Sequence, residues 1–338
     1  VNFALASVPS SFILPGLFII SAFIATAMGT SMGTIAAIAP VALGVSEVSD
    51  IELVLAISSV VGGAMFGDNL SIISDTTIAA TRTQGCEMKD KFRMNVKLAI
   101  PAALITLVVL YFAGADSQLA DVGDYEYILI LPYLAVLALA VLGINVFVVL
   151  FSGLLLASGI GYFHQETYGI ASISQDIYTG FGAMQETMLL SLLIGGLAAL
   201  MRSEGGLAWI SAKLQALVSK LADLGLMQTK AGEICIALLV ALMNFATANN
   251  TIAILISGTV AKEIAEKYQV SAARSASLLD IFSCVVQGLI PYGAQILLAS
   301  SIAAISPFAL VSSIYYCWAL AIITVFFVLF LWPREDKR

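Results

Sequence analysis

The stretch Thr30-Ser-Met-Gly-Thr34-Ile-Ala interrupts an apolar run and is echoed downstream by Thr247-Ala-Asn-Asn-Thr251-Ile-Ala. A second pair of similar stretches, residues 53–63 and 278–288, follows in the same order. The offsets are 217 and 225 residues, so we interpret the pairs as an internal duplication with eight extra residues between the motifs. In a bilayer, polar breaks of this kind are tolerated only where they are buried in protein or line a polar cavity.

The composition is typical of a polytopic membrane protein. Of the 338 residues, 60% are hydrophobic and 11% are charged, whereas a soluble domain carries roughly 25% charged residues. The polar stretches are too short for a separate core, so residues 1–338 are expected to form a single membrane transporter domain. The predicted partners are the lipid bilayer and a small cation or small organic solute, with no nucleic acid and with a homodimer left open.

The basic residues indicate how the apolar segments cross the membrane. All 15 lysines and arginines lie in residues 82–97, 202–230, 262–274 and 334–338. Because cytoplasmic connections are enriched in Lys and Arg, these clusters and the C-terminus are expected on the cytoplasmic side. All of them stay there if residues 247–251 form the tip of a re-entrant hairpin, and the tip at 30–34 is then entered from outside. Two kinked full spans are the alternative.

The predicted fold class is therefore an all-α polytopic membrane protein with two inverted repeats, each with a re-entrant hairpin and a broken transmembrane helix. Repeat 1 covers about residues 10–114, repeat 2 about 231–332, and linking helices occupy 127–226, with helix breaks at 67–71 and 291–293. The chain begins with Val1 rather than Met, and we expect further N-terminal helices upstream of it. Inverted repeats whose half-helices meet near the membrane midplane are typical of secondary transporters.

The most specific motif is Gly67-Asp-Asn-Leu-Ser-Ile-Ile-Ser-Asp-Thr-Thr77. It resembles the NhaC-type sodium/proton antiporter family of the ion transporter superfamily, whose hallmark is similar to Gly-Asp-x-x-Ser-Pro-x-Ser-Asp-Thr-Thr. Here Ile72 stands at the proline position, and the stretch Phe245-Ala-Thr-Ala-Asn-Asn-Thr251 also belongs to the resemblance. The resemblance implies exchange of Na+ for H+ without any cofactor. Members of the superfamily also exchange malate and lactate or carry amino acids, so the family indicates the mechanism better than the cargo.

Carboxylates inside the apolar segments favour a cation as the cargo. Asp68 and Asp75 are the predicted Na+ ligands and switching acids, and Asp280 is a third proton-coupling candidate, because an acid within the membrane is costly and is usually functional. Burial favours the protonated form of a carboxyl, so such a group can bind H+ and release it when Na+ arrives. The alternative for Asp75 is that its carboxylate is only solvated or caps a helix end. Asp280 replaces Leu55 in the repeat alignment, so it is either a pore-side partner or an interfacial acid.

Neutral oxygen donors accompany these acids in both halves. The predicted ion- or substrate-binding residues besides Asp68 and Asp75 are Thr30, Ser31 and Thr34 at the first tip, Asn69, Ser71, Ser74, Thr76 and Thr77 at the first break, Thr247, Asn249, Asn250 and Thr251 at the second tip, and Tyr292 and Gln295 at the second break. The alternative for the asparagines is that they only satisfy exposed helix ends.

The sequence thus predicts a secondary active transporter and not an enzyme. We expect a sodium/proton antiporter that works by alternating access in a bacterial cytoplasmic membrane. A proton- or sodium-coupled transporter of malate, lactate or an amino acid is the alternative. An intramembrane aspartyl protease is a remote alternative, because Asp68 and Asp280 do not occupy equivalent positions in the two repeats.

Overall fold

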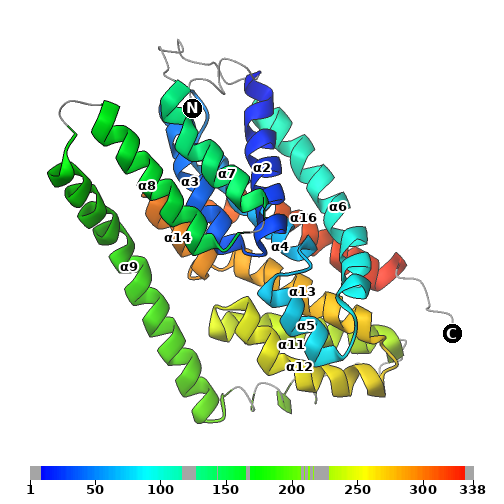
Figure 1. The fold of residues 1–338 in the computed structure, drawn as a ribbon. Coiled ribbons are helices and arrows are strands. Elements are labelled where there is room, and N and C mark those ends of the chain that lie inside the picture. Colours follow the sequence, from blue (N-terminus) through cyan, green and yellow to red (C-terminus); the bar gives the residue numbers. More distant parts are fainter. Residues whose placement is uncertain are drawn as a thin grey trace.

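The computed structural model describes residues 9–115, 127–142, 144–164, 168–206, 209, 212–213, 216 and 228–331. Over these residues the chain is helical and contains no β-strand (Figure 1). The predicted all-α class is therefore confirmed. The rest of the predicted linking region, the C-terminal basic cluster at 334–338 and the first eight residues lie outside the described part of the chain.

The helices follow one another along the chain in two groups that flank a linking region. In order they are η1 (Ser10–Phe12), α2 (Ile13–Met28), α3 (Ser31–Glu47), α4 (Leu53–Leu70), α5 (Asp75–Gln84), α6 (Met88–Ala113), η2 (Tyr127–Ile130), α7 (Leu131–Val141), α8 (Val146–His164), α9 (Ile170–Ser203), α11 (Gln228–Thr247), α12 (Asn250–Lys267), α13 (Ala272–Leu289), α14 (Ala294–Ala303), α15 (Pro307–Ser313), α16 (Tyr315–Phe326) and η3 (Phe327–Leu331), a π-helical turn.

Several of these elements are suited to a bilayer. Among the described residues, six helical stretches are long and apolar enough to cross a membrane, and a pair bent by 51° at residue 314 would make a seventh. Two of the six, Leu53–Gln84 and Ala272–Ala303, each contain a break. Because α2 and α11 are also long enough to cross, the re-entrant and inverted insertion of the two hairpins stays a prediction.

Two helical hairpins turn at the polar stretches that the sequence marks. The turn between α2 and α3 is at Gly29 (φ 70°), and the turn between α11 and α12 is at Ala248 (φ 49°). Thr30 caps α3 by accepting from the Gly33 N–H at 3.3 Å, and Asn249 caps α12 by accepting from the Ile252 N–H at 3.0 Å. These caps satisfy N–H groups that a helix starting inside a membrane would otherwise leave unpaired.

The broken helices are interrupted slightly later than the sequence indicates. Helix α4 continues through Asp68 to Leu70, and the break occupies residues 71–74, so the prediction of a break at 67–71 is wrong. The reason is that the Ser71 N–H still donates a helical hydrogen bond to the Gly67 carbonyl oxygen at 2.8 Å. The second break occupies residues 290–293. Asp68 thus belongs to the last turn of a helix and not to an unwound segment.

A single shift of 219 residues relates the two groups of helices. It moves α4 onto α13, both of 18 residues, and α5 onto α14, both of 10 residues. It also carries the left-handed turn residue Gly29 onto Ala248 and the left-handed C-cap Gly85 onto Ala304. The duplication is supported, but the offsets of 217 and 225 are wrong because matching side-chain types misplaced the helix ends.

The corrected register changes the counterparts of the acidic residues. Asp280 corresponds to Val61 and not to Leu55, and Asp68 corresponds to Gln287. The two hairpin tips align through their capping residues Thr30 and Asn249. The carboxylates therefore do not repeat, whereas the architecture does.

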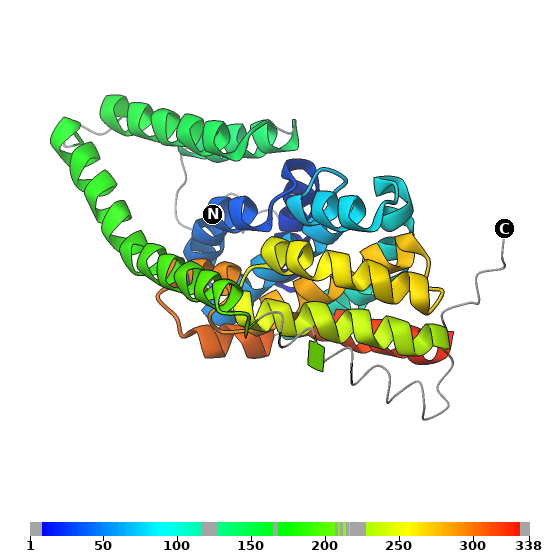
Figure 2. The ribbon, with the colours of Figure 1, turned by 90° about the horizontal axis from the view of Figure 1, so that it is seen from below.

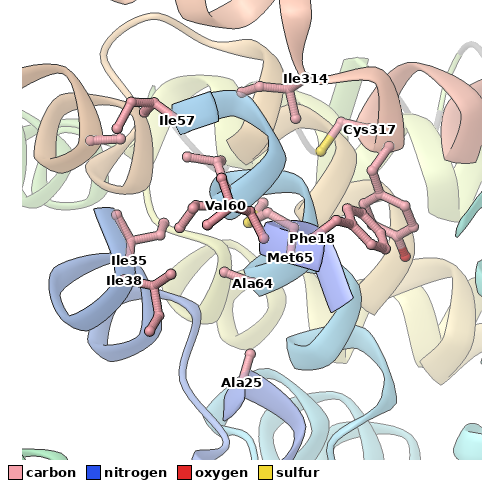
Figure 3. Close-up of a cluster of buried hydrophobic side chains, with 14 of the residues drawn as sticks. Phe18, Ala25, Ile35, Ile38, Ile57, Val60, Ala64, Met65, Ile314 and Cys317 are labelled. Carbon is pink, nitrogen blue, oxygen red and sulfur yellow. The ribbon is translucent and has the colours of Figure 1, made fainter. Parts of the chain in front are cut away.

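The core has two hydrophobic parts that meet around the breaks. One is built from α2, α3, α4, α6 and α14–α16. Figure 3 shows part of it around α4, with Ile35 and Ile38 on one side and Phe18 and Cys317 on the other. The other lies among α5 and α11–α13. Figures 1 and 2 show the long helix α9 along one side of the molecule. The tips and breaks lie between the two parts.

Close packing of α2 on α4 depends on glycines. A Cβ atom at Gly63 would lie 2.2 Å from the Phe18 carbonyl oxygen, and one at Gly67 would lie 2.3 Å from the Ala22 carbonyl oxygen. We expect Gly63→Ala to lower the free energy of unfolding by about 1–3 kcal/mol, because backbone atoms cannot move aside as a flexible side chain can. Thermal unfolding of the purified protein in detergent measures the loss.

Gly16→Ala in α2 is the matched control, since no heavy atom lies within 4 Å of a Cβ at that position. This variant should unfold at or above the wild-type midpoint. Equal midpoints for Gly63→Ala and Gly16→Ala would contradict the close contact between the helices.

Candidate functional site

Both hairpin tips and both helix breaks surround one cavity of about 160 Å³. Its walls are Gly29, Thr30, Ser31 and Met32 of the first hairpin, Asp68, Asp75 and Thr76 around the first break, Asn249, Asn250 and Thr251 of the second hairpin, and Gln287, Ala294 and Gln295 around the second break. A water molecule takes up about 30 Å³ in the liquid, so the cavity has room for a small ion with a few waters.

The structure brings together nine of the predicted site residues. Those that line the cavity are Thr30, Ser31, Asp68, Asp75, Thr76, Asn249, Asn250, Thr251 and Gln295. They come from helices far apart in the sequence, and both halves contribute. The juxtaposition follows from the two hairpin tips lying against the two breaks.

Other predicted ligands lie behind the cavity wall and use their hydroxyls for the backbone. The donors Ser71, Thr77, Thr34, Thr247 and Tyr292 bond to the carbonyl oxygens of Thr26, Ser71, Thr30, Met243 and Phe245, respectively. Ser74 caps α5 by accepting from the Thr77 N–H at 3.2 Å. These groups shape the tips and breaks, and they are not among the residues that line the cavity.

Asn69 also turns away from the cavity. Its Nδ2 atom donates to the Tyr316 hydroxyl at 3.0 Å and to Cys284 Sγ at 3.2 Å. These partners belong to α16 and α13, so the predicted role of the Asn69 side chain as a ligand does not match its position. The side chain instead fixes the end of α4.

Asp68 is the buried acid of the cavity. Only 7% of the residue is exposed, and one carboxylate oxygen accepts a hydrogen bond from Ser31 Oγ at 3.1 Å. Gln295 Nε2 donates in turn to Ser31 Oγ at 3.2 Å. Asp68 forms no ion pair with any residue that the structure describes. A cation in the cavity would therefore find a carboxylate that no lysine or arginine neutralises by direct contact.

Asp75 lies at the opening of the same cavity. It is an exposed residue and the first of α5. The capping alternative does not describe it, because the side chain that caps this helix belongs to Ser74. A carboxylate in the first helical turn is still favoured by the helix dipole.

Asp280 is held in an ion pair outside the cavity. Its carboxylate lies 2.8 Å from Lys91 Nζ and accepts from Asn95 Nδ2 at 2.7 Å. Lys91 also donates to the Asn69 carbonyl oxygen at 3.1 Å and to Thr77 Oγ1 at 2.6 Å. The Lys91 ammonium thus bridges the two sides of the first break and joins them to α13.

Lys91 belongs to a basic cluster expected at the cytoplasmic surface, whereas its side chain is 1% exposed. The reason is its position on the buried face of α6, where Asn95, Leu98 and Ala102 follow it at helical spacing. A lysine that continues an apolar stripe was the signal available in the sequence. Gln287 was missed as well, because the misaligned register hid its relation to Asp68.

A comparison with protein families decides where the chain belongs. The model described as the Na+/H+ antiporter family matches residues 2–115 and 125–332. The chain belongs to the Na+/H+ antiporter family. It is an integral membrane protein of a family of transporters, and the predicted membership is confirmed.

Similar proteins agree with this family. The chain is 27% identical over 320 residues to the Na+/H+ antiporter NhaC of Bacillus subtilis, which covers 84% of this chain and 68% of that protein. It is 25% identical to the NhaC of Alkalihalophilus pseudofirmus, over 78% of this chain and 62% of the relative. A malate-2H+/Na+-lactate antiporter of Bacillus subtilis is 38% identical, but over 31% of this chain and 22% of the relative.

These shares mean that the chain spans 68% and 62% of the length of the two NhaC relatives. The matched part of the Na+/H+ antiporter family contains all the residues that line the cavity. The polar cavity therefore lies within the part of the chain that matches the family.

Proposed function

We propose that the protein is a sodium/proton antiporter that exchanges Na+ for H+ at the cavity by alternating access. Family membership and the NhaC relatives support this function. The observation that carries the proposal is the Asp68 carboxylate, which is buried, has no ion-pair partner among the described residues, and lines a cavity shared by both halves.

Competition for Asp68 couples the two ions. A carboxylate in a poorly hydrated cavity is costly unless a cation or a proton balances its charge. Asp68 and Asp75 bind Na+, and hydroxyl and amide oxygens of the tips, such as those of Thr30 and Asn250, complete its coordination shell. When Na+ leaves, a proton neutralises Asp68 and allows the unloaded site to reorient. Both ions are cargo, so no cofactor is required.

The hairpin tips provide the movable walls of the site. Ser31 at the first tip contacts Asp68, and Gln295 of the second half contacts Ser31. A displacement of either half changes these contacts and opens the cavity on one side. We place the protein in the cytoplasmic membrane of a bacterium with its C-terminus inside, where proton entry drives Na+ export. A homodimer is compatible with these features.

The alternatives have less support. The malate-2H+/Na+-lactate antiporter matches less than half as much of the chain as NhaC does, so a malate or lactate cargo has less support than Na+. An arginine/ornithine antiporter of Halobacterium salinarum matches 83% of the chain, but at 22% identity against 27% for NhaC. A protease would need two carboxyls that share a proton. Asp280 is paired with Lys91 and does not line the cavity with Asp68.

Exchange by purified protein in proteoliposomes tests the proposed function. With an imposed pH gradient, added NaCl should dissipate the gradient, and choline chloride at the same ionic strength should not. Parallel samples receive malate with lactate, or arginine, in sodium-free buffer. A response to an organic solute together with no response to Na+ would contradict sodium/proton exchange.

A further inference from the structure

Gln287 lines the cavity from α13, although it is not among the binding residues predicted from the sequence. The residue is fully buried, and its Nε2 atom donates to the Ala248 carbonyl oxygen at 2.9 Å and to Gln295 Oε1 at 2.8 Å. A backbone carbonyl only accepts hydrogen bonds, so the nitrogen of the amide must face Ala248. This contact fixes the direction of the amide oxygen.

The Oε1 atom of Gln287 is buried and has no hydrogen-bond partner among the described residues. Buried acceptors are nearly always paired, because an unpaired one costs free energy. The cavity beside it also contains the carboxylates of Asp68 and Asp75, so a cation is the partner that these groups would share. Carbonyl and carboxylate oxygens are the ligands that hard cations prefer.

Neighbouring groups hold the amide in this orientation. Ala248 has a left-handed backbone, which is costly for a residue other than glycine, and Gln287 ties this turn to α13. Gly293 leaves room for the amide, since a Cβ there would lie 3.2 Å from Gln287 Nε2 and 2.6 Å from the Gln287 carbonyl oxygen. The arrangement therefore fixes the free oxygen before any ligand arrives.

The repeat register makes Gln287 the counterpart of Asp68. Gln287 lies two positions before Leu289, the last residue of α13, and Asp68 lies two positions before Leu70, the last residue of α4. Both residues line the same cavity. The other charged groups nearby are Asp75 at the opening and the Lys91–Asp280 pair behind the wall. The two halves thus offer a carboxylate and a neutral amide at matched positions.

We propose that Gln287 is a Na+ ligand whose neutral amide keeps a further proton-binding carboxylate out of the site and so limits the number of protons exchanged per Na+. This inference rests on the proposed function and assigns the charge of that same site. A carboxylate at this position would have to be neutralised whenever the site is empty, which adds one proton to each cycle.

Gln287→Met tests the role as a ligand, because methionine keeps the unbranched shape and removes the oxygen. In proteoliposomes, the Na+ concentration that gives the half-maximal exchange rate should rise about tenfold, as expected for the loss of one charge-assisted contact. Gln175→Met on α9, where the glutamine is exposed, is the matched control and should keep the wild-type value.

Gln287→Glu tests the role in stoichiometry. The membrane potential is clamped to zero with K+ and valinomycin, and the pH difference across the membrane is fixed. The measurement is the ratio of Na+ concentrations on the two sides at which net proton flux stops. With a pH difference of about one unit, each additional proton per Na+ raises this ratio about tenfold, the factor that corresponds to about 1.4 kcal/mol. We expect that increase for Gln287→Glu and none for Gln175→Glu.

The outcomes separate this inference from the proposed function. Absence of Na+/H+ exchange by the wild-type protein would overturn the proposed function itself. Exchange by the wild type with an unchanged half-saturating Na+ concentration in Gln287→Met would overturn the inference alone. An active Gln287→Glu variant with the wild-type balance ratio would also overturn it, and if that variant does not fold, the methionine variant decides.

Discussion

Asp68→Asn abolishes the dissipation of a pH gradient by Na+. Asparagine keeps the size of the side chain and can still accept the hydrogen bond from Ser31 Oγ. It cannot gain or lose a proton in the cycle, and it brings no negative charge to the cavity. The exchange rate should fall about 100-fold or more, which corresponds to the loss of about 3 kcal/mol from a contact with a charged group.

The assay uses proteoliposomes with an internal pH-sensitive dye and equal amounts of wild-type and variant protein. Asp176→Asn is the matched control, since this carboxylate on α9 is exposed and accepts a hydrogen bond from the Tyr168 hydroxyl at 2.5 Å. It should exchange at the wild-type rate. Wild-type exchange by Asp68→Asn would remove Asp68 from the mechanism and, with it, the coupling described above.

Lys91→Met destabilises the fold more than any change at an exposed charge. It leaves the Asp280 carboxylate buried with Asn95 as its polar partner and removes the bridge between the Asn69 carbonyl and Thr77. Breaking a buried ion pair by removing one partner costs about 3–5 kcal/mol. Unfolding midpoints in detergent, together with the yield of monodisperse protein, measure this effect.

Two further variants define the cause. Lys89→Met is the matched control two residues away, because Lys89 pairs with Glu87 at the surface with side chains 64% and 67% exposed. Its unfolding midpoint should match that of the wild type, because an exposed ion pair adds little to stability. The double variant Lys91→Met/Asp280→Leu removes both charges and should recover most of the stability. Equal midpoints for Lys91→Met and Lys89→Met would show that the buried pair adds nothing to the fold.

The sequence indicated many of the residues that line the cavity, because membrane burial makes polar interruptions conspicuous. A hydroxyl or amide inside an apolar run must be satisfied by protein, so the stretches at residues 30–34 and 247–251 indicated helix ends and lie at the two tips. Asp68 and Asp75 line the cavity for the same reason. The prediction of nine lining residues needed only this rule and the resemblance to the family.

The remaining features depend on three-dimensional packing that a single sequence does not specify. Lys91 was assigned to the cytoplasmic surface because basic residues usually lie there, yet Asp280 and Thr77 from other helices make its burial favourable. The hydroxyls of Thr34 and Thr247 were expected at the ion, yet each bonds the preceding helical turn. The register between the two repeats follows from helix ends and left-handed turns, which side-chain types alone do not reveal.

The contact between Lys91 and Asp280 also restricts how relatives can diverge. Because each charge is buried against the other at 2.8 Å, a lineage that loses one passes through a poorly folded ancestor unless the second position changes as well. The two positions, separated by most of the chain, are therefore expected to mutate together, so that relatives keep both charges or neither. Exposed pairs such as Lys89 with Glu87 are free to drift independently.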